Sequence, residues 1–303
     1  MTEQRAVFDR RDVIQAVVDH AGGRLSGDEV VEHSDRWLRS EAAIPLTTEP
    51  KASGSIERQL FTTPTMVRIE QAITDAYKRG HDQDAGVVPE HFVETEIRRW
   101  ETGTGYALGD DQRAMVHSIC GSGDRFQAVV GPAGSGKTAA LEVAARAWES
   151  AGYTVIGAAV NGTAAELLQR STGVDSRTVA GLVTRLDTAT DSVLDDRTVV
   201  LIDEASTLGN RPHARLVHHV EGSGAVMRSI GDPAQHSAVE AGGMWAQMVD
   251  QYPDRVPVLT ENRRQAVAEM TDVRLANADY RACLLYTSPS PRDRTRSRMP
   301  SSA

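Results

Sequence analysis

Residues 126–150 read FQAVVGPAGSGKTAALEVAARAWES. A short run rich in apolar residues (126–130) comes first, then a glycine-rich stretch, then an alanine-rich segment of strong helix formers. This order predicts a buried strand, a tight loop and a helix. Units of this kind build parallel sheets that are covered by helices on both faces. The stretch therefore predicts an α/β fold.

The loop of this unit fits the pattern G-x-x-x-x-G-K-[ST] and is called the P-loop below. Its glycines let backbone N–H groups turn inward and cradle phosphate oxygens at a helix N-terminus. Lys137 is expected to reach the β- and γ-phosphates of ATP, and the Thr138 hydroxyl to ligate Mg²⁺. A glycine-rich turn without a ligand is the alternative for an isolated loop, but the flanking strand and helix favour nucleotide binding. The expected cofactor-binding residues of the loop are Gly131, Pro132, Ala133, Gly134, Ser135, Gly136, Lys137 and Thr138.

Two later strands also end in polar residues. VVLIDEAS (199–206) places Asp203 and Glu204 after an apolar run, and GDPAQ (231–235) ends in Gln235. Because parallel strands present their carboxyl ends at one edge of a sheet, these residues are expected beside the P-loop. Asp203 is expected to help hold Mg²⁺, and Glu204 to polarise the attacking water. The Gln235 amide is expected to bond the γ-phosphate or that water. The alternatives are exposed strand-end carboxylates and an ordinary turn.

The chain changes character near residue 105. Before it, helical periodicity predominates and no strand run is expected; helices are predicted over Asp9–His20, Met66–Arg79 and Pro89–Trp100. After it, apolar β-rich runs alternate with helical stretches. The predicted strands are Phe126–Val130, Thr154–Val160, Thr198–Ile202, Ala225–Ile230 and Val256–Leu259. The predicted architecture is a parallel α/β sheet flanked by helices and preceded by a small, mainly helical domain.

Composition narrows the class of protein. The 303 residues carry a net charge of −9, which argues against a simple basic protein that coats DNA. That charge does not exclude a motor, whose strand contacts are few and lie in a groove. No apolar run reaches the length of a membrane span, and the N-terminus lacks a signal-peptide core. Only Cys120 and Cys283 are present, which suits a reducing compartment, so a cytoplasmic location is expected.

Four motifs together carry a family resemblance: GPAGSGKT, IDEAS, GDPAQHSAVEAGGMW and LTENRRQ. They resemble the first motor domain of superfamily-one DNA helicases of the RecD-like branch, and more narrowly the helicase part of MobF-type conjugative relaxases. The resemblance implies a RecA-like motor domain over residues 106–282, ATP hydrolysis with Mg²⁺ and 5′-to-3′ movement on single-stranded DNA. It also implies partners in the conjugation machinery. The motifs of a second motor domain do not appear, so a fragment that hydrolyses ATP without unwinding is expected.

The resemblance assigns further roles by position. Gln112 matches the family glutamine that reads adenine, and Arg264 matches the arginine that meets the γ-phosphate, where it is expected to act with Lys137 and Glu204. The alternative for Gln112 is a surface residue on a capped helix. Two further segments match DNA-contacting motifs, with ordinary helix capping as the equally weighted alternative. Their expected DNA-binding residues are Asn161, Gly162, Thr163 and Thr178.

Residues 283–303, CLLYTSPSPRDRTRSRMPSSA, differ abruptly from the preceding sequence. They resemble the translation of a transposon-type sequencing adapter, so we expect a non-native tail and an interrupted reading frame. The sequence also allows two other functions. One is a nucleotide-gated module that binds single-stranded DNA without turnover, and the other is a RecD-like helicase subunit of an exonuclease complex.

Overall fold

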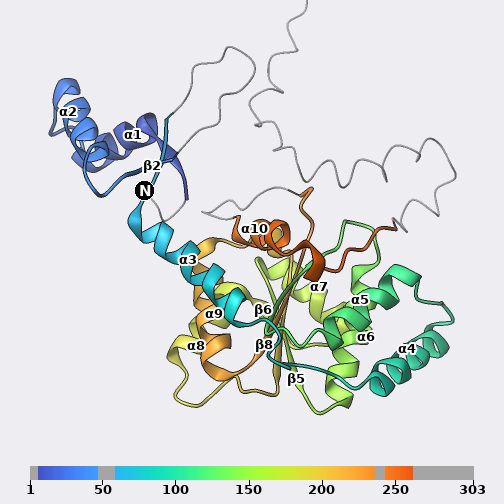
Figure 1. Ribbon diagram of the computed structural model, residues 1–303. Helices are drawn as coiled ribbons and strands as arrows, with labels where there is room; N and C mark the ends of the chain where they lie inside the picture. Colours follow the sequence, from blue (N-terminus) through green and yellow to red (C-terminus); the bar gives the residue numbers. More distant parts are fainter. Residues whose placement is uncertain (1–5, 47–58, 236–242, 262–303) are drawn as a thin grey trace, which may run out of the picture. The chain divides into compact units, whose positions relative to one another are not determined.

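The structure, a computed structural model, describes residues 6–46, 59–235 and 243–261 (Figure 1). Its centre is a five-stranded sheet in the order β4-β8-β7-β5-β6. Every pair of neighbouring strands runs parallel, which confirms the predicted fold class. The strands are β4 (Phe126–Val130), β5 (Thr154–Ala159), β6 (Ser176–Thr178), β7 (Thr198–Asp203) and β8 (Val226–Gly231).

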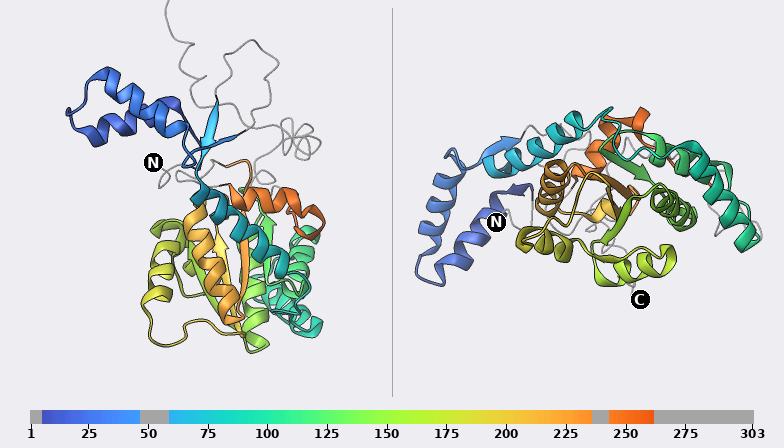
Figure 2. Two further views of the ribbon diagram at one scale, coloured as in Figure 1. Left: turned by 60° about the vertical axis from the view of Figure 1, so that its left-hand side comes forward. Right: turned by 90° about the horizontal axis from the view of Figure 1, so that it is seen from below.

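Helices cover both faces of this sheet (Figures 1 and 2). One group contains α4 (Glu90–Thr104), α5 (Asp110–Gly121), α6 (Lys137–Ser150) and α7 (Gly162–Thr172), which pack against one another through α6. The other group contains α3 (Pro64–Arg79), α8 (Val179–Thr188) and α9 (Asn210–Ser223), which meet at α9. The helix α10 (Met244–Gln251) lies against β4 and α3.

The core lies between the sheet and these helices because the central strands are apolar on both faces. β7 is buried from Thr198 to Ile202, and β8 is buried along its whole length. The β8 residue Arg228 is fully buried as well, and its guanidinium donates to the carbonyl oxygens of Ile119 and Asp124 at 2.9 and 2.8 Å. Carbonyl oxygens of α5 and of the loop that follows it thus compensate part of the cost of burying this charge.

The N-terminal region contains more strand than its sequence predicts. Helices α1 (Arg10–Ala21) and α2 (Gly27–Leu38) begin at capping boxes set by Asp9 and Ser26. Beside them lies an antiparallel sheet in the order β1-β3-β2. The expectation of no strand before residue 105 is therefore wrong, because strands this short leave no periodic signal. They are β1 (Phe8–Asp9), β2 (Ile44–Leu46) and β3 (Leu60–Thr62).

The last predicted strand, Val256–Leu259, is reduced to a single parallel bridge between Val258 and Val130 of β4. Two hydrogen bonds hold it, from Val130 N to Pro257 O at 3.0 Å and from Leu259 N to Val130 O at 2.9 Å. Pro257 has no N–H to donate, which limits the ladder. The segment nevertheless lies at the β4 edge of the sheet, before the described residues end at Glu261.

The core of the sheet domain extends upstream of residue 105. Val88, Val93 and Ile97 belong to the same buried cluster as β4 and α6, and Trp100 donates to Glu142 of α6 at 2.8 Å. The proposed division at residue 105 thus marks a change in sequence pattern. In the structure, α4, which precedes it, packs with the sheet domain. None of the helices among the described residues is long and apolar enough to span a membrane.

Candidate functional site

The P-loop joins β4 to α6 in the conformation that its glycines permit. Gly134 and Gly136 have φ angles of +85° and +76°, which residues with a Cβ seldom adopt. The Ser135 side chain is buried and donates to the Pro132 carbonyl at 2.8 Å, closing the turn. Helix α6 then begins at Lys137. Its first-turn N–H groups therefore border the loop, as an anion site requires.

The end of β7 faces the start of α6. The Lys137 ammonium lies 3.1 Å from Asp203 Oδ1, and both side chains are mostly buried, with 18% and 16% of their surface exposed. The structure thus brings the P-loop lysine to the strand-end aspartate. Thr138 is exposed next to Lys137 in α6. A hydroxyl and a carboxylate are hard oxygen donors of the kind that Mg²⁺ prefers, so this pair fits the expected metal.

Glu204 has an unusual backbone. Its φ and ψ angles are 57° and 33°, in the left-handed region, and it precedes a short 3₁₀ turn (Ala205–Thr207). Its N–H donates to Asp203 Oδ1 at 2.9 Å, and its carbonyl accepts from the Thr207 hydroxyl at 2.8 Å. The Glu204 carboxylate accepts no hydrogen bond within the part of the chain that the structure describes. This carboxylate is therefore available to a ligand.

The loop after β8 is bonded directly to the P-loop. Asp232 is buried, and its Oδ2 accepts from Ala133 N at 3.0 Å and from the Gln235 amide at 3.3 Å. The main chains also meet, because Gly131 N donates to Gly231 O at 2.8 Å. Gln235 therefore lies near the P-loop through Asp232. The sequence interpretation assigned no role to Asp232, whose only signal was its position in a turn motif.

Gln112 contacts the P-loop too, but with its amide already engaged. The side chain is buried, its Nε2 donates to Gly136 O at 2.8 Å, and its Oε1 accepts from Gly109 N at 3.0 Å. It is not the surface glutamine of the alternative interpretation. To bind adenine through both its oxygen and its nitrogen, the Gln112 amide must give up its bonds to Gly136 O and Gly109 N. Adenine recognition by Gln112 therefore stays a prediction.

The expected DNA-contacting residues cap helices. Asn161 Oδ1 accepts from Ala164 N at 2.8 Å at the start of α7, and Thr178 Oγ1 accepts from Gly181 N at 3.0 Å at the start of α8. The capping alternative is therefore present in the structure. Gly162 and Thr163 are exposed in the first turn of α7. Contact of these four residues with DNA stays a prediction, as does the role of Arg264, which lies outside the described residues together with 283–303.

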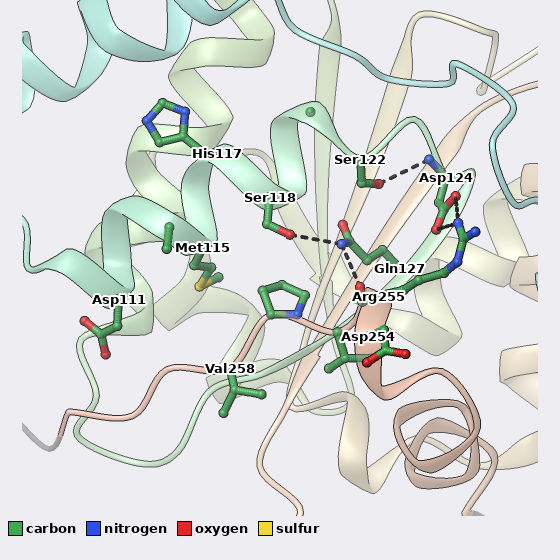
Figure 3. Close-up of a pocket in the computed structure, with 14 residues that line it drawn as sticks. Asp111, Met115, His117, Ser118, Ser122, Asp124, Gln127, Asp254, Arg255 and Val258 are labelled. Atoms are coloured by element: carbon green, nitrogen blue, oxygen red, sulfur yellow. Dashed lines mark hydrogen bonds and ion pairs between the residues drawn. The ribbon is translucent and has the colours of Figure 1, made fainter.

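A pocket of about 660 Å³ lies elsewhere, along α5 and residues 254–258 (Figure 3). Figure 3 shows Asp111 at one end of it and Asp124 at the other. Between them the Gln127 amide donates to Ser118 Oγ at 3.3 Å and to Arg255 O at 3.0 Å. No P-loop residue lines this pocket. This pocket is therefore separate from the P-loop.

Both a protein family and individual known proteins match this chain. A family model described as an AAA domain matches residues 107–283. A probable conjugal transfer protein TraA of Sinorhizobium fredii is 32% identical over 259 residues. Conjugal transfer proteins TraA of Agrobacterium fabrum and Rhizobium radiobacter are each 31% identical, over 252 and 255 residues. Each match covers 82% of this chain, which spans only 22% of the length of each relative.

Proposed function

This chain belongs to the AAA domain family, and from that premise we propose that it is the ATP-hydrolysing motor domain of a DNA helicase that serves conjugative transfer. The motifs GDPAQ and LTENRRQ favour the RecD-like branch of superfamily one and 5′-to-3′ movement along single-stranded DNA. The proposed motor domain spans residues 106–282. Its proposed partners are ATP, Mg²⁺, single-stranded DNA and proteins of the conjugation machinery.

The proposed chemistry is attack of water on the γ-phosphorus of ATP, which breaks the bond to the β–γ bridging oxygen and releases ADP and phosphate. The loop amides of Gly134, Gly136 and Lys137 bind the phosphate oxygens, because Gly131 N and Ala133 N already donate within the protein, and the Lys137 side chain offsets the phosphate charge. Thr138 and Asp203 would hold Mg²⁺, which when bound would supply positive charge that offsets the charge of the phosphates. Glu204 orients the attacking water and accepts its proton. In this proposal Gln235 and Arg264 complete the contacts to the γ-phosphate.

The proximity of Lys137 to Asp203 carries this proposal. The lysine would have to reach phosphate and the aspartate would have to help hold the metal that accompanies it, so the two side chains have to share one site. Their separation of 3.1 Å meets that requirement. The strained backbone at Glu204 supports it further, since left-handed non-glycine residues cluster where function needs them.

Two substitutions test the proposal. We expect Lys137→Ala to abolish binding of a fluorescent ATP analogue, and Glu204→Gln to keep binding while reducing ATP turnover by about a hundredfold or more. Turnover is measured with and without single-stranded DNA. The matched control is Lys78→Ala, which removes an exposed lysine of α3. Unchanged nucleotide binding in Lys137→Ala contradicts the site, whereas tight binding with no turnover in the wild type favours a nucleotide-gated DNA-binding module.

A further inference from the structure

Neighbouring residues of α5 bond to two separate parts of the chain. Gln112 donates to Gly136 O of the P-loop at 2.8 Å. The Asp111 carboxylate accepts from Thr260 N and Glu261 N, each at 3.0 Å from its Oδ2. Figure 3 shows the Asp111 side chain at the α5 end of the pocket that residues 254–258 border. The first turn of α5 thus joins the P-loop to the last described segment of the chain.

The bonds of Asp111 are of a strong type. Its Oδ1 also accepts from Gln112 N at 2.8 Å, so one carboxylate receives three backbone N–H groups. Hydrogen bonds to an ionised acceptor are about twice as strong as those between neutral groups. A carboxylate in the first turn of a helix is also stabilised by the helix dipole. Its neighbour Asp110 is exposed and makes none of these contacts.

The segment that Asp111 holds is also attached to the sheet domain, because Leu259 is fully buried in its core and Gln127 Nε2 of β4 donates to Arg255 O at 3.0 Å. Its parallel pairing with β4 consists of one bridge at Val258 and two hydrogen bonds. Beyond that bridge, the two bonds from Thr260 and Glu261 to Asp111 fix the direction of the main chain. The position of this segment is therefore tied to α5 and not only to the sheet.

We propose that Asp111 is a positioning residue that couples nucleotide occupancy of the P-loop to the position of the main chain at Thr260 and Glu261. The inference rests on the proposed function, because it requires a nucleotide at the P-loop. Phosphate binding orders the Gly136 peptide, whose carbonyl holds Gln112, and Gln112 N is bonded to Asp111. The coupling requires that the Gln112 amide keep its bond to Gly136 O, so it is an alternative to the predicted contact of Gln112 with adenine. A nucleotide that favours this ordered arrangement must also favour the state in which Thr260 and Glu261 are held.

Hydrogen exchange of backbone amides measures the coupling directly. The intact chain is compared with and without a non-hydrolysable ATP analogue and Mg²⁺, and exchange is followed at the P-loop amides of residues 131 and 133–137 and at Thr260 and Glu261. We expect the nucleotide to slow exchange in both segments, by about tenfold or more at Thr260 and Glu261. In Asp111→Ala the P-loop response is retained and the response at Thr260 and Glu261 is lost. Asp110→Ala is the matched control and keeps both responses.

The outcomes separate the two proposals. Slower exchange at the P-loop amides with no change at Thr260 and Glu261 in the wild type overturns the coupling and leaves nucleotide binding in place. A full response at both segments in Asp111→Ala overturns the role of this carboxylate. No response at the P-loop amides overturns nucleotide binding and the coupling with it. If Asp111→Ala does not fold, Asp111→Asn replaces it, since Asn keeps one acceptor oxygen, and a partial loss at Thr260 and Glu261 is expected.

Discussion

The left-handed backbone at Glu204 is costly for a residue with a side chain. Contact between Cβ and the following carbonyl makes this conformation about 1–2 kcal/mol less favourable than the right-handed one. Glycine adopts it freely, yet the chain has a glutamate there. The conformation places a carboxylate without a protein hydrogen-bond partner in the described structure directly after Asp203. This backbone conformation therefore lowers the stability of the fold but fixes the position of the Glu204 carboxylate.

Substitutions at Glu204 measure this cost in stability. We expect Glu204→Gly to raise the free energy of unfolding by about 1 kcal/mol, because relief of strain outweighs the greater freedom of glycine in the unfolded chain. Glu204→Ala removes the same carboxylate but retains Cβ, and so should not gain stability. Urea denaturation measures both variants. Equal stability of Gly and Ala at this position would contradict the strain argument.

Only some acids of this region could be recognised from sequence. Asp203 and Glu204 follow a buried strand that lies downstream of a P-loop, and that order predicts their neighbourhood. Asp232 and Asp111 act instead by accepting main-chain N–H groups from distant residues. No spacing pattern encodes such acceptors, because their donors become neighbours only when the chain folds. Helix capping by Asn161 and Thr178, in contrast, involves residues close together in sequence, so the sequence alone indicates it as an alternative.

At the scale of elements, β8 ends where three parts of the chain converge. A Cβ added to Gly231 would lie 2.7 Å from Ser206 N and 2.9 Å from the Trp245 ring. The ring cannot easily move, since its Nε1 donates to Ser229 O at 3.0 Å. The close approach of the turn after Glu204 to β8 therefore requires glycine at this position.

We expect Gly231→Ala to destabilise the protein by about 1–3 kcal/mol, the usual cost of overpacking. It should also weaken nucleotide binding, because the Gly231 carbonyl accepts from Gly131 of the P-loop. Gly162→Ala is the matched control: a Cβ there meets nothing within 4 Å, and its φ is not positive. Thermal unfolding and nucleotide titration check both variants. A Gly231→Ala protein as stable as Gly162→Ala would refute the packing argument.

The long elements could be predicted and the short ones could not. β5, β7 and β8 are continuous apolar runs, so their boundaries agree with prediction to within one residue. β6 and the three N-terminal strands contain two or three residues each, and they exist only through pairing with partners far along the chain. The helix α2 is mostly polar, and its capping box at Ser26 was the signal that could have found it.

At the scale of the whole described structure, α3 is joined to the sheet domain through buried polar groups. The Tyr77 hydroxyl lies 3.4 Å from His213 Nε2 of α9 and 3.5 Å from Ser229 Oγ of β8. Burial lowers the pKa of His213 from 6.5 to about 4 and raises the pKa of Tyr77 to about 12. Both side chains are therefore neutral in the folded protein at neutral pH.

This burial predicts a pH-dependent stability. Between pH 6.5 and about 4, the unfolded chain binds a proton at His213 that the folded chain does not. The stabilisation from neutral His213 is thus complete above pH 6.5 and is lost as the pH falls toward 4, by about 3 kcal/mol at most. We expect His213→Leu to flatten this part of the profile in urea denaturation. His218→Leu, which changes an exposed histidine of α9, should retain the slope.

The single bridge at Val258 has a mechanical consequence. It attaches the C-terminal described segment to β4, which is also the strand that leads into the P-loop. Tension on the chain beyond Glu261 would first load the bonds of Thr260 and Glu261 to Asp111 and then the two hydrogen bonds of the bridge, which lie on the P-loop strand itself. The nucleotide and the applied force would then act on the same strand, β4. Force applied to the chain beyond Glu261 should therefore change the affinity for ATP.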